Sequence, residues 1–211
     1  MAMITDDPQD VPRVEAFSFT AEYHAKARDL IARYPAGRQA SAVIGCLDLA
    51  QRQAGGWLPR AAMDHVATLL EMAPIRVYEV ATFYTMFQLK PRGRYLLQVC
   101  TTTPCWLRGS DAVMKACRDV SGVPPGEVSA DGLFSTVEVE CLGACVNAPM
   151  MQINDDFYED LDEASTRRLL EAFKRGETPR AGPQVDRQTS APVGGPTTLT
   201  SVSGAAAPGD R

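Results

Sequence analysis

The sequence contains no long run of apolar residues and no glycine-rich phosphate-binding motif. None of its stretches approaches the apolar length that a membrane-crossing helix needs, so no direct membrane insertion is expected. No G-x-G-x-x-G segment follows a predicted strand and no P-loop occurs, which leaves the chain without a recognisable nucleotide-binding site. The balance of 21 basic and 26 acidic residues, a net charge of −5, gives no electrostatic basis for nucleic-acid binding.

Histidine is also scarce, and no two cysteines have the spacing of a redox-active dithiol. A Rieske centre needs two histidine ligands, but His24 and His65 both lie in predicted helical sequence far from the paired cysteines. The absence of a C-x-x-C motif argues against thiol–disulfide catalysis. The acidic N-terminal residues resemble neither a secretory signal nor a transit peptide, so we expect the chain to lie in a reducing cytosol.

Four of the six cysteines form two close pairs, and each pair directly follows a predicted β-strand. Four residues separate Cys100 from Cys105, and three separate Cys141 from Cys145. Loops at the ends of neighbouring strands can bring four thiolates to one point, as an iron–sulfur cluster with all-cysteine ligation requires. The pattern therefore indicates a metal site that transfers single electrons.

Disulfides, unligated thiols and a zinc site are the alternatives to an iron–sulfur cluster. In a reducing cytosol, spaced cysteines are more often metal ligands than cross-links. Structural zinc sites usually use compact cysteine knuckles, whereas thirty-five residues separate the two pairs here. Both metals are chemically possible, but the wider loops favour a two-iron cluster. A single [2Fe-2S] centre bound by Cys100, Cys105, Cys141 and Cys145 is the simplest assignment.

The other two cysteines are predicted to be core residues. Cys46 lies among apolar residues that recur at helical spacing, and Cys117 lies on a predicted helix with apolar neighbours on the same face. A free cysteine in such a setting behaves as a small apolar side chain. We therefore expect neither residue to have a redox role.

The N-terminal half is predicted to be helical. Residues 1–17 are polar and proline-containing, typical of an extended arm, and residues 18–90 are predicted to form a helical domain. Apolar periodicity and the proline and glycine boundary signals predict four helices: Ala21 to Arg33, Gln39 to Gln53, one from Pro59 through Leu70, and one from Pro74 through Tyr84. Helices this short must bury their apolar faces against each other or against a partner.

Residues 91–176 are predicted to form a second domain with a different pattern. The expected elements are a strand Tyr95 to Val99, a helix Leu107 to Val120, a strand Phe134 to Glu140, a strand Met150 to Ile153, a turn at 154–155, and a helix Asp162 to Lys174. Periodicity alone therefore predicts an α+β fold.

Residues 177–211 differ in composition from both predicted domains. They are rich in Pro, Gly, Ala, Ser and Thr and contain almost no large apolar side chains. Such a segment buries too little surface to offset its ordering entropy, so it is predicted to be a disordered tail. An extended strap along a partner subunit is the alternative.

Three segments carry a resemblance to a known family. VCTTTPCWLRGSD and ECLGACVNAPMMQIND, preceded by APIRVYEVATFYTMF, resemble the small [2Fe-2S] subunit of respiratory NADH:quinone oxidoreductase, complex I. The resemblance covers about residues 15–180. It implies that Cys100, Cys105, Cys141 and Cys145 ligate one [2Fe-2S] cluster. It also implies an N-terminal helical bundle followed by a thioredoxin-like [2Fe-2S] ferredoxin domain.

The resemblance further implies a function and partners. The chain is expected to be an electron-transfer subunit of NADH:quinone oxidoreductase, with its cluster near the FMN of a larger NADH-binding flavoprotein subunit. A large iron–sulfur subunit would be a second partner, and the complex would hold the chain at the cytoplasmic side of a bacterial inner membrane. No complete active site is expected on this chain alone. The equivalent subunit of an NAD-linked formate dehydrogenase or hydrogenase, and a zinc-stabilised binding module without redox function, are the alternatives.

Two smaller expectations concern tuning and docking. Backbone N–H groups in the loops 101–104 and 142–144 are expected to donate to the sulfur atoms and raise the reduction potential, except at Pro104, which has no N–H. Glu140 is expected either to lower that potential or to be a solvated carboxylate at a strand end. The aromatic residues near residue 80 are expected to be core residues at helical spacing, with docking to the flavoprotein as the alternative: Tyr78, Phe83, Tyr84 and Phe87.

Overall fold

The chain folds into two compact units, Met1–Arg92 and Gly93–Arg211. We describe a computed structural model in which residues 11–195 and 197–198 are placed. The division lies two residues beyond the boundary expected at residues 90 and 91. The expected N-terminal arm and C-terminal tail lie partly outside the described residues, at 1–10, 196 and 199–211.

Helices make up the first unit, and local sequence signals explain where they begin. They are α1 (Ala21–Ile31), a 3-10 helix (Gln39–Ala42), α2 (Val43–Gln53), α3 (Arg60–Leu69) and α4 (Pro74–Phe83). The Thr20 hydroxyl accepts a hydrogen bond from the Tyr23 N–H and caps α1. Pro74 occupies the first turn of α4, where its missing N–H leaves no bond unmade. The single helix expected over residues 39–53 is α-helical only from Val43 onward.

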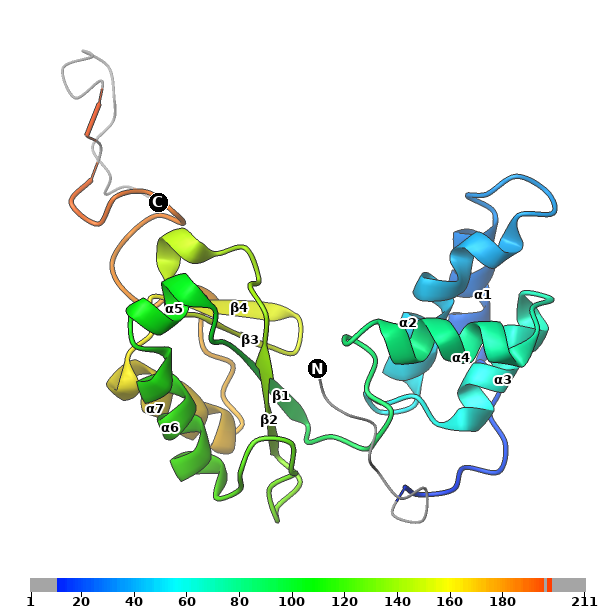
Figure 1. The fold of residues 1–211 in the computed structure, drawn as a ribbon, viewed down its shortest axis with the longest axis horizontal. Coiled ribbons are helices and arrows are strands. Elements are labelled where there is room, and N and C mark those ends of the chain that lie inside the picture. The colour runs from blue at the N-terminus through cyan, green and yellow to red at the C-terminus, as the bar shows by residue number, and fades with distance from the viewer. Residues whose placement is uncertain (1–10, 196, 199–211) are drawn as a thin grey trace. The chain divides into compact units, whose positions relative to one another are not determined.

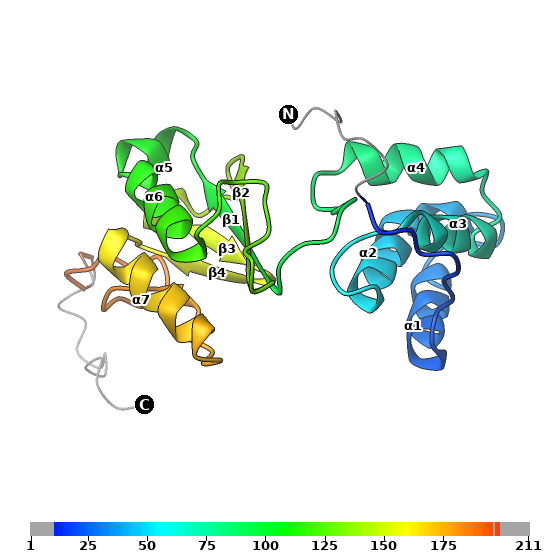
Figure 2. The ribbon, with the colours of Figure 1, turned by 90° about the horizontal axis from the view of Figure 1, so that it is seen from below.

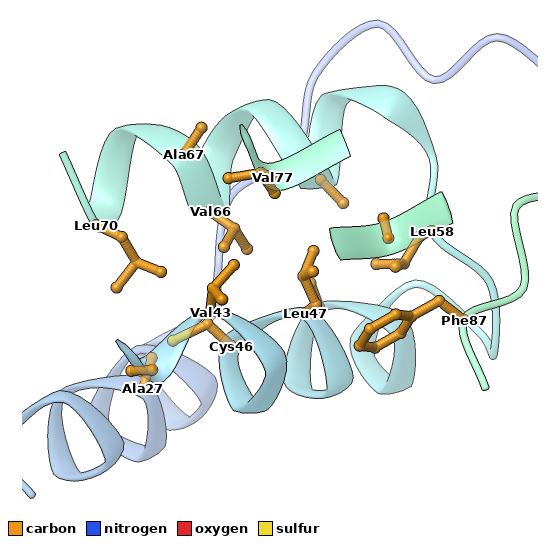
Figure 3. Packing of buried hydrophobic residues seen from close by; sticks show 14 of the residues in the cluster. Ala27, Val43, Cys46, Leu47, Leu58, Val66, Ala67, Leu70, Val77 and Phe87 are labelled. Carbon is orange, nitrogen blue, oxygen red and sulfur yellow. The ribbon is translucent and has the colours of Figure 1, made fainter. Parts of the chain in front are cut away.

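Cys46 is a buried residue in the core of the first unit. Figure 3 shows Cys46 beside Ala27 and Val43, between helices, and its side chain is fully buried. It belongs to a cluster that contains apolar residues from every helix of this unit, and Phe17 and Phe19 join the same core from before α1. His65 accepts a hydrogen bond from the Phe19 N–H at 3.4 Å, so it is a satisfied, partly buried side chain.

The aromatic residues near α4 do not all lie in this core. Phe87 is buried, as expected, and the Tyr78 hydroxyl donates a hydrogen bond to the Asp64 carboxylate. The expectation of a core position is wrong for Phe83 and Tyr84, whose exposed fractions are 77% and 40%. Both residues lie at the C-terminal end of α4, where the helix stops presenting one face to the core.

A five-stranded sheet in the order β2-β1-β3-β4-β5 organises the second unit. Its strands are β1 (Tyr95–Cys100), β2 (Phe134–Val139), β3 (Met151–Ile153), β4 (Asp156–Glu159) and β5 (Gly182–Pro183). β1 pairs in parallel with β2 and antiparallel with β3, and β5 pairs in parallel with β4. Neither β4 nor β5 was expected, because β4 follows directly on a turn and β5 is two residues long.

Two long helices pack side by side against this sheet. Figures 1 and 2 show α6 (Ser110–Ser121) and α7 (Glu163–Lys174) as neighbours, and the same buried cluster contains side chains from both helices and from strands β1 to β4. Cys117 lies fully buried in that cluster. The expected helix from Leu107 is divided, since α5 (Thr103–Leu107) ends before Gly109, whose positive φ of 100° starts α6 in a new direction.

The expectation of a disordered tail is wrong for the first part of residues 177–211. Gly182 and Pro183 form β5 beside β4, and the Gln184 N–H donates to the Glu159 carbonyl at 2.9 Å. Backbone pairing and one buried ion pair stabilise this segment in place of large apolar side chains. Composition alone does not reveal such contacts.

Candidate metal centre

Parallel pairing of β1 and β2 brings the two cysteine loops to one end of the sheet. Cys100 is the last residue of β1 and lies opposite Val139, the last residue of β2. Cys141 follows two residues later. Because parallel strands end at the same edge, segments far apart in the sequence leave the sheet together. The sequence-based expectation that neighbouring strand ends would bring the cysteine pairs together agrees with this arrangement.

The first loop presents two buried sulfur atoms. Cys100 and Cys105 are 2% and 1% exposed. The loop turns at Thr102, which has an extended backbone and occupies the N-cap position of α5, the short helix that carries Cys105. The Thr102 hydroxyl oxygen lies 3.2 Å from the Cys100 sulfur. Pro104 in the first turn of α5 removes an N–H that would have no helical partner, and so helps the chain turn directly after β1.

The second loop presents two exposed sulfur atoms. The Cys141 and Cys145 sulfurs lie 3.3 Å apart, and the Gly143 N–H points at the Cys141 sulfur from 3.4 Å. Gly143 has a φ of 87°, a conformation that a side chain would strain. A short 3-10 helix, Cys145–Asn147, then leads to Pro149, which follows a cis peptide bond.

Burial and neighbouring groups change the pKa values of three of these thiols in different directions. Burial raises the pKa of Cys105 to about 12, and a hydrogen bond with Cys100 acts in the same direction. The Gly143 N–H lowers the pKa of Cys141, and contacts with Cys145, Thr102 and Cys100 lower it further. The contact with Cys141 raises the pKa of Cys145. Thiolates this close repel each other, so a cationic centre is what allows all four to be deprotonated together.

This donor set fits a [2Fe-2S] cluster. Four thiolates, two from each loop, match all-cysteine ligation of two irons. Among residues 11–195 and 197–198, no three His, Cys, Asp or Glu side chains are grouped closely enough to hold a single metal ion. A two-iron cluster distributes its four ligands over two metal atoms and does not need that compact arrangement.

The two remaining cysteines are core residues and not part of the two loops, as the sequence predicted. Cys46 belongs to the core of the first unit and Cys117 to the core of the second. Burial raises the pKa of Cys46 to about 11 and that of Cys117 to about 12. Both side chains therefore remain neutral thiols with low nucleophilicity near pH 7.

Three polar groups beside the cysteines were not singled out from the sequence. The Thr102 hydroxyl lies between Cys100 and Cys141, and the backbone of Met150 hydrogen-bonds to Cys105. The Glu138 carboxylate accepts a hydrogen bond from the Thr101 hydroxyl. The expected tuning residue Glu140 is exposed, as Glu138 is, and lies just beyond the end of β2. The parallel register, in which Val99 lies opposite Glu138, could have identified Glu138.

Exposed apolar side chains flank the two loops. Trp106 and Leu107 follow Cys105 and are 57% and 71% exposed, and Val146 follows Cys145 and is 71% exposed. Elsewhere in this unit the large apolar side chains of the helices and strands are mostly buried. The cysteines therefore lie next to an apolar surface of the isolated chain.

Comparison with known proteins gives a consistent result. The family model for the thioredoxin-like [2Fe-2S] ferredoxin matches residues 27–174. The E subunit of NADH-quinone oxidoreductase from Rickettsia bellii is 53% identical over 162 residues, which cover 77% of this chain and 97% of the relative. The mitochondrial NADH dehydrogenase [ubiquinone] flavoprotein 2 of Dictyostelium discoideum is 52% identical over 183 residues, covering 87% of this chain and 74% of the relative.

A solved structure supports the same fold. An NAD+-reducing [NiFe]-hydrogenase in the H2-reduced state aligns with a TM-score of 0.55 and 26% sequence identity. The alignment covers 63% of this chain but 22% of the hydrogenase chain, so the similarity concerns a small part of that protein. No helix in the described part of this chain is long and apolar enough to cross a membrane. From its family-model match and its relatives, the chain belongs to the thioredoxin-like [2Fe-2S] ferredoxin family and, within it, to the E subunits of NADH-quinone oxidoreductase.

Proposed function

We propose that this chain is the electron-transfer subunit of an NADH:quinone oxidoreductase and that Cys100, Cys105, Cys141 and Cys145 bind its single [2Fe-2S] cluster. The observation that supports the ligand assignment most directly is the parallel pairing of β1 and β2, which ends both strands at one sheet edge and places the two cysteine loops there. Membership of the E-subunit family supports the oxidoreductase function. We further infer that the N-terminal helices, which share one core, form the helical bundle expected from the sequence.

Different residues of this chain would supply the sulfur ligands and the hydrogen bond at the site. A [2Fe-2S] cluster, when bound, accepts and releases one electron at a time. Cys100 and Cys105 supply sulfur ligands from a buried position, and Cys141 and Cys145 supply them from the surface. The Gly143 N–H donates to a ligand sulfur and stabilises added negative charge there. A partner can therefore approach the site from the side of the exposed cysteines, Cys141 and Cys145.

Partners must supply the two-electron chemistry. NADH delivers a hydride, so a flavin is needed to convert it into single electrons. The sequence offers no nucleotide-binding motif, and we propose that FMN and NADH bind to a flavoprotein subunit that docks beside the cysteine loops. A large iron–sulfur subunit of the same complex is the second proposed partner. The complex would hold this chain in the cytoplasm, peripheral to a bacterial inner membrane.

An NAD-linked hydrogenase or formate dehydrogenase is the second candidate assembly. The structural similarity to part of an NAD+-reducing [NiFe]-hydrogenase favours the hydrogenase over the formate dehydrogenase. Affinity purification of the full chain from its own cells, followed by identification of the co-purified subunits, separates the three assemblies. Recovery of quinone-reducing subunits supports the first proposal, and recovery of a hydrogenase large subunit replaces it.

Single cysteine replacements test the ligand assignment. Replacing Cys100, Cys105, Cys141 or Cys145 with serine should sharply reduce bound iron and acid-labile sulfide and the paramagnetic signal after dithionite reduction. Cys46→Ala and Cys117→Ala are matched controls, because both remove a cysteine from elsewhere in the fold, and they should keep the full iron content. A wild-type chain that binds zinc and no sulfide would support the zinc-stabilised module instead.

A further inference from the structure

Residues 179–191, here called the C-terminal strap, run along the second cysteine loop. The Tyr158 hydroxyl donates to the Pro179 carbonyl at 3.3 Å, and β5 then pairs with β4. Further along, the Asn147 side-chain amide donates to the Thr189 carbonyl at 3.1 Å. Asn147 is 1% exposed and ends the short helix that begins with Cys145. The strap is therefore bonded both to the sheet and to the segment that carries a proposed ligand.

Arg187 joins the strap to two other segments at once. Its Nε and Nη2 atoms donate to the two carboxylate oxygens of Asp160 at 2.8 and 2.6 Å, a two-point geometry that only arginine can form. Nη2 also donates to the Val146 carbonyl at 3.3 Å, and Nη1 to the Ala191 carbonyl at 3.4 Å. The guanidinium thus contacts the residue that directly follows Cys145.

Burial distinguishes this ion pair from the others in the described residues. The side chains of Arg187 and Asp160 are 7% and 11% exposed, whereas the other ion pairs given by the structure lie between groups at least 33% exposed. Removing two charges from water costs free energy that an apolar pair of the same volume would not cost, so stability alone does not account for it. We interpret this pair as a contact that fixes one geometry of the segments it joins.

Hydrogen bonds at Asn147 fix the backbone of the segment that follows Cys145. Its backbone N–H donates to the Ala144 carbonyl at 3.0 Å, and its carbonyl accepts from the Asp160 N–H at 2.7 Å. The residue that pairs with Arg187 therefore also fixes the backbone two residues after Cys145. Strap, strand end and cysteine loop form one hydrogen-bonded unit through Arg187, Asp160 and Asn147.

We propose that the C-terminal strap holds the second cysteine loop in its metal-binding geometry and that Arg187 is the positioning residue through which it acts. The proposal rests on the assignment of Cys145 as a cluster ligand. Groups that orient metal ligands in this way typically change metal affinity by about 10-fold to 100-fold when they are replaced. The net charge of the Arg187–Asp160 pair is zero, so the intact pair positions the loop without adding net charge beside the site.

Hydrogen exchange of the metal-free full chain tests the positioning role without any cluster. Arg187→Gln should speed exchange at the Asn147 and Ala148 amides by about tenfold, because the loop loses its bond to the strap. Arg175→Gln is the matched control, since it breaks an exposed ion pair with Glu177 in the same unit, and it should leave those two amides unchanged. Unchanged exchange in Arg187→Gln would overturn the proposal.

The loaded chain provides two further readouts. Arg187→Lys keeps the charge but not the two-point geometry, and it should release iron to a chelator about tenfold faster than wild type. Asp160→Asn leaves a permanently charged guanidinium beside the loop and should raise the reduction potential, which a purely structural defect would not do in a defined direction. A wild-type chain without iron and sulfide would refute the ligand assignment, whereas a loaded wild type with unaffected variants would refute the strap alone.

Discussion

Replacing Thr102 with valine removes one hydroxyl group from between the two cysteine loops and preserves the shape of the side chain. The hydroxyl oxygen lies 3.2 Å from the Cys100 sulfur and also contacts Cys141. A cysteine bound to iron is a thiolate and can only accept, so the hydroxyl must be the donor in the loaded protein. The Thr102 side chain does not cap α5, and the helix therefore keeps its N-terminal bonds in the variant.

The expected effect of Thr102→Val is a lower reduction potential. A hydrogen bond to a charged acceptor contributes about 1.5–3 kcal/mol, of which we assign about 1 kcal/mol to the extra charge of the reduced state. For a one-electron couple, a tenfold change in equilibrium constant is about 59 mV. Since about 1.4 kcal/mol corresponds to that tenfold change, the potential should fall by roughly 40 mV.

A redox titration monitored by paramagnetic resonance measures this difference on the full chain. Thr103→Val is the matched control, because Thr103 is exposed and is the first residue of α5. The reduction potential of this variant should equal that of wild type. Iron and sulfide content must be the same in all three proteins. A Thr102→Val potential equal to or above the wild-type value would refute the reasoning that this hydroxyl donates to a ligand sulfur.

Three other replacements test separate parts of the second unit. Glu138→Gln should raise the reduction potential, and by more than Glu140→Gln, because only the Glu138 carboxylate contacts the loop after β1; equal potentials in the same titration would contradict this. Gly93→Ala would place a Cβ atom 2.5 Å from the Phe134 backbone and should cost about 1–3 kcal/mol in urea unfolding, whereas an alanine at the open position Gly194 should be neutral. Asp162→Ala should cost about 1 kcal/mol at pH 7, since the carboxylate caps α7. The Ser165 N–H lowers the pKa of Asp162 below 3.8, so this carboxylate stabilises the fold above that pH, and the difference from the variant should shrink as the pH falls through the lower pKa; a difference that grows on acidification would exclude this explanation.

Strong local signals made much of the fold predictable. Proline at the first turn of α4 and alternating residues in β2 identified these elements, because each signal depends on neighbouring residues alone. Local signals also place each cysteine pair directly after a strand, although only the pairing of the two strands brings the pairs to one edge. The sequence does not predict the break before α6, although Gly109 marks it, because a lone glycine does not reveal its backbone angles.

Contacts between distant segments could not be predicted in the same way. The sequence does not indicate Thr102, because its neighbour Cys141 comes 39 residues later and only the parallel register brings them together. Glu140 adjoins Cys141 in sequence and is the carboxylate that the sequence indicates, whereas the Glu138 carboxylate contacts Thr101 on the neighbouring strand's loop. Arg187 lies in a segment whose composition predicts disorder, and its ordering depends on one acidic partner, Asp160.

The crossover between β1 and β2 imposes an order on how the protein can be made. While the chain is being synthesised, Cys100 and Cys105 are complete long before β2 exists, and the other pair of sulfurs emerges only after β2 has been translated. Pairings between segments this far apart form slowly, because the intervening loop must first be closed. Arg187 follows Cys145 by 42 residues, so the contact that we propose to hold the second cysteine loop can form only after both cysteine pairs have been translated.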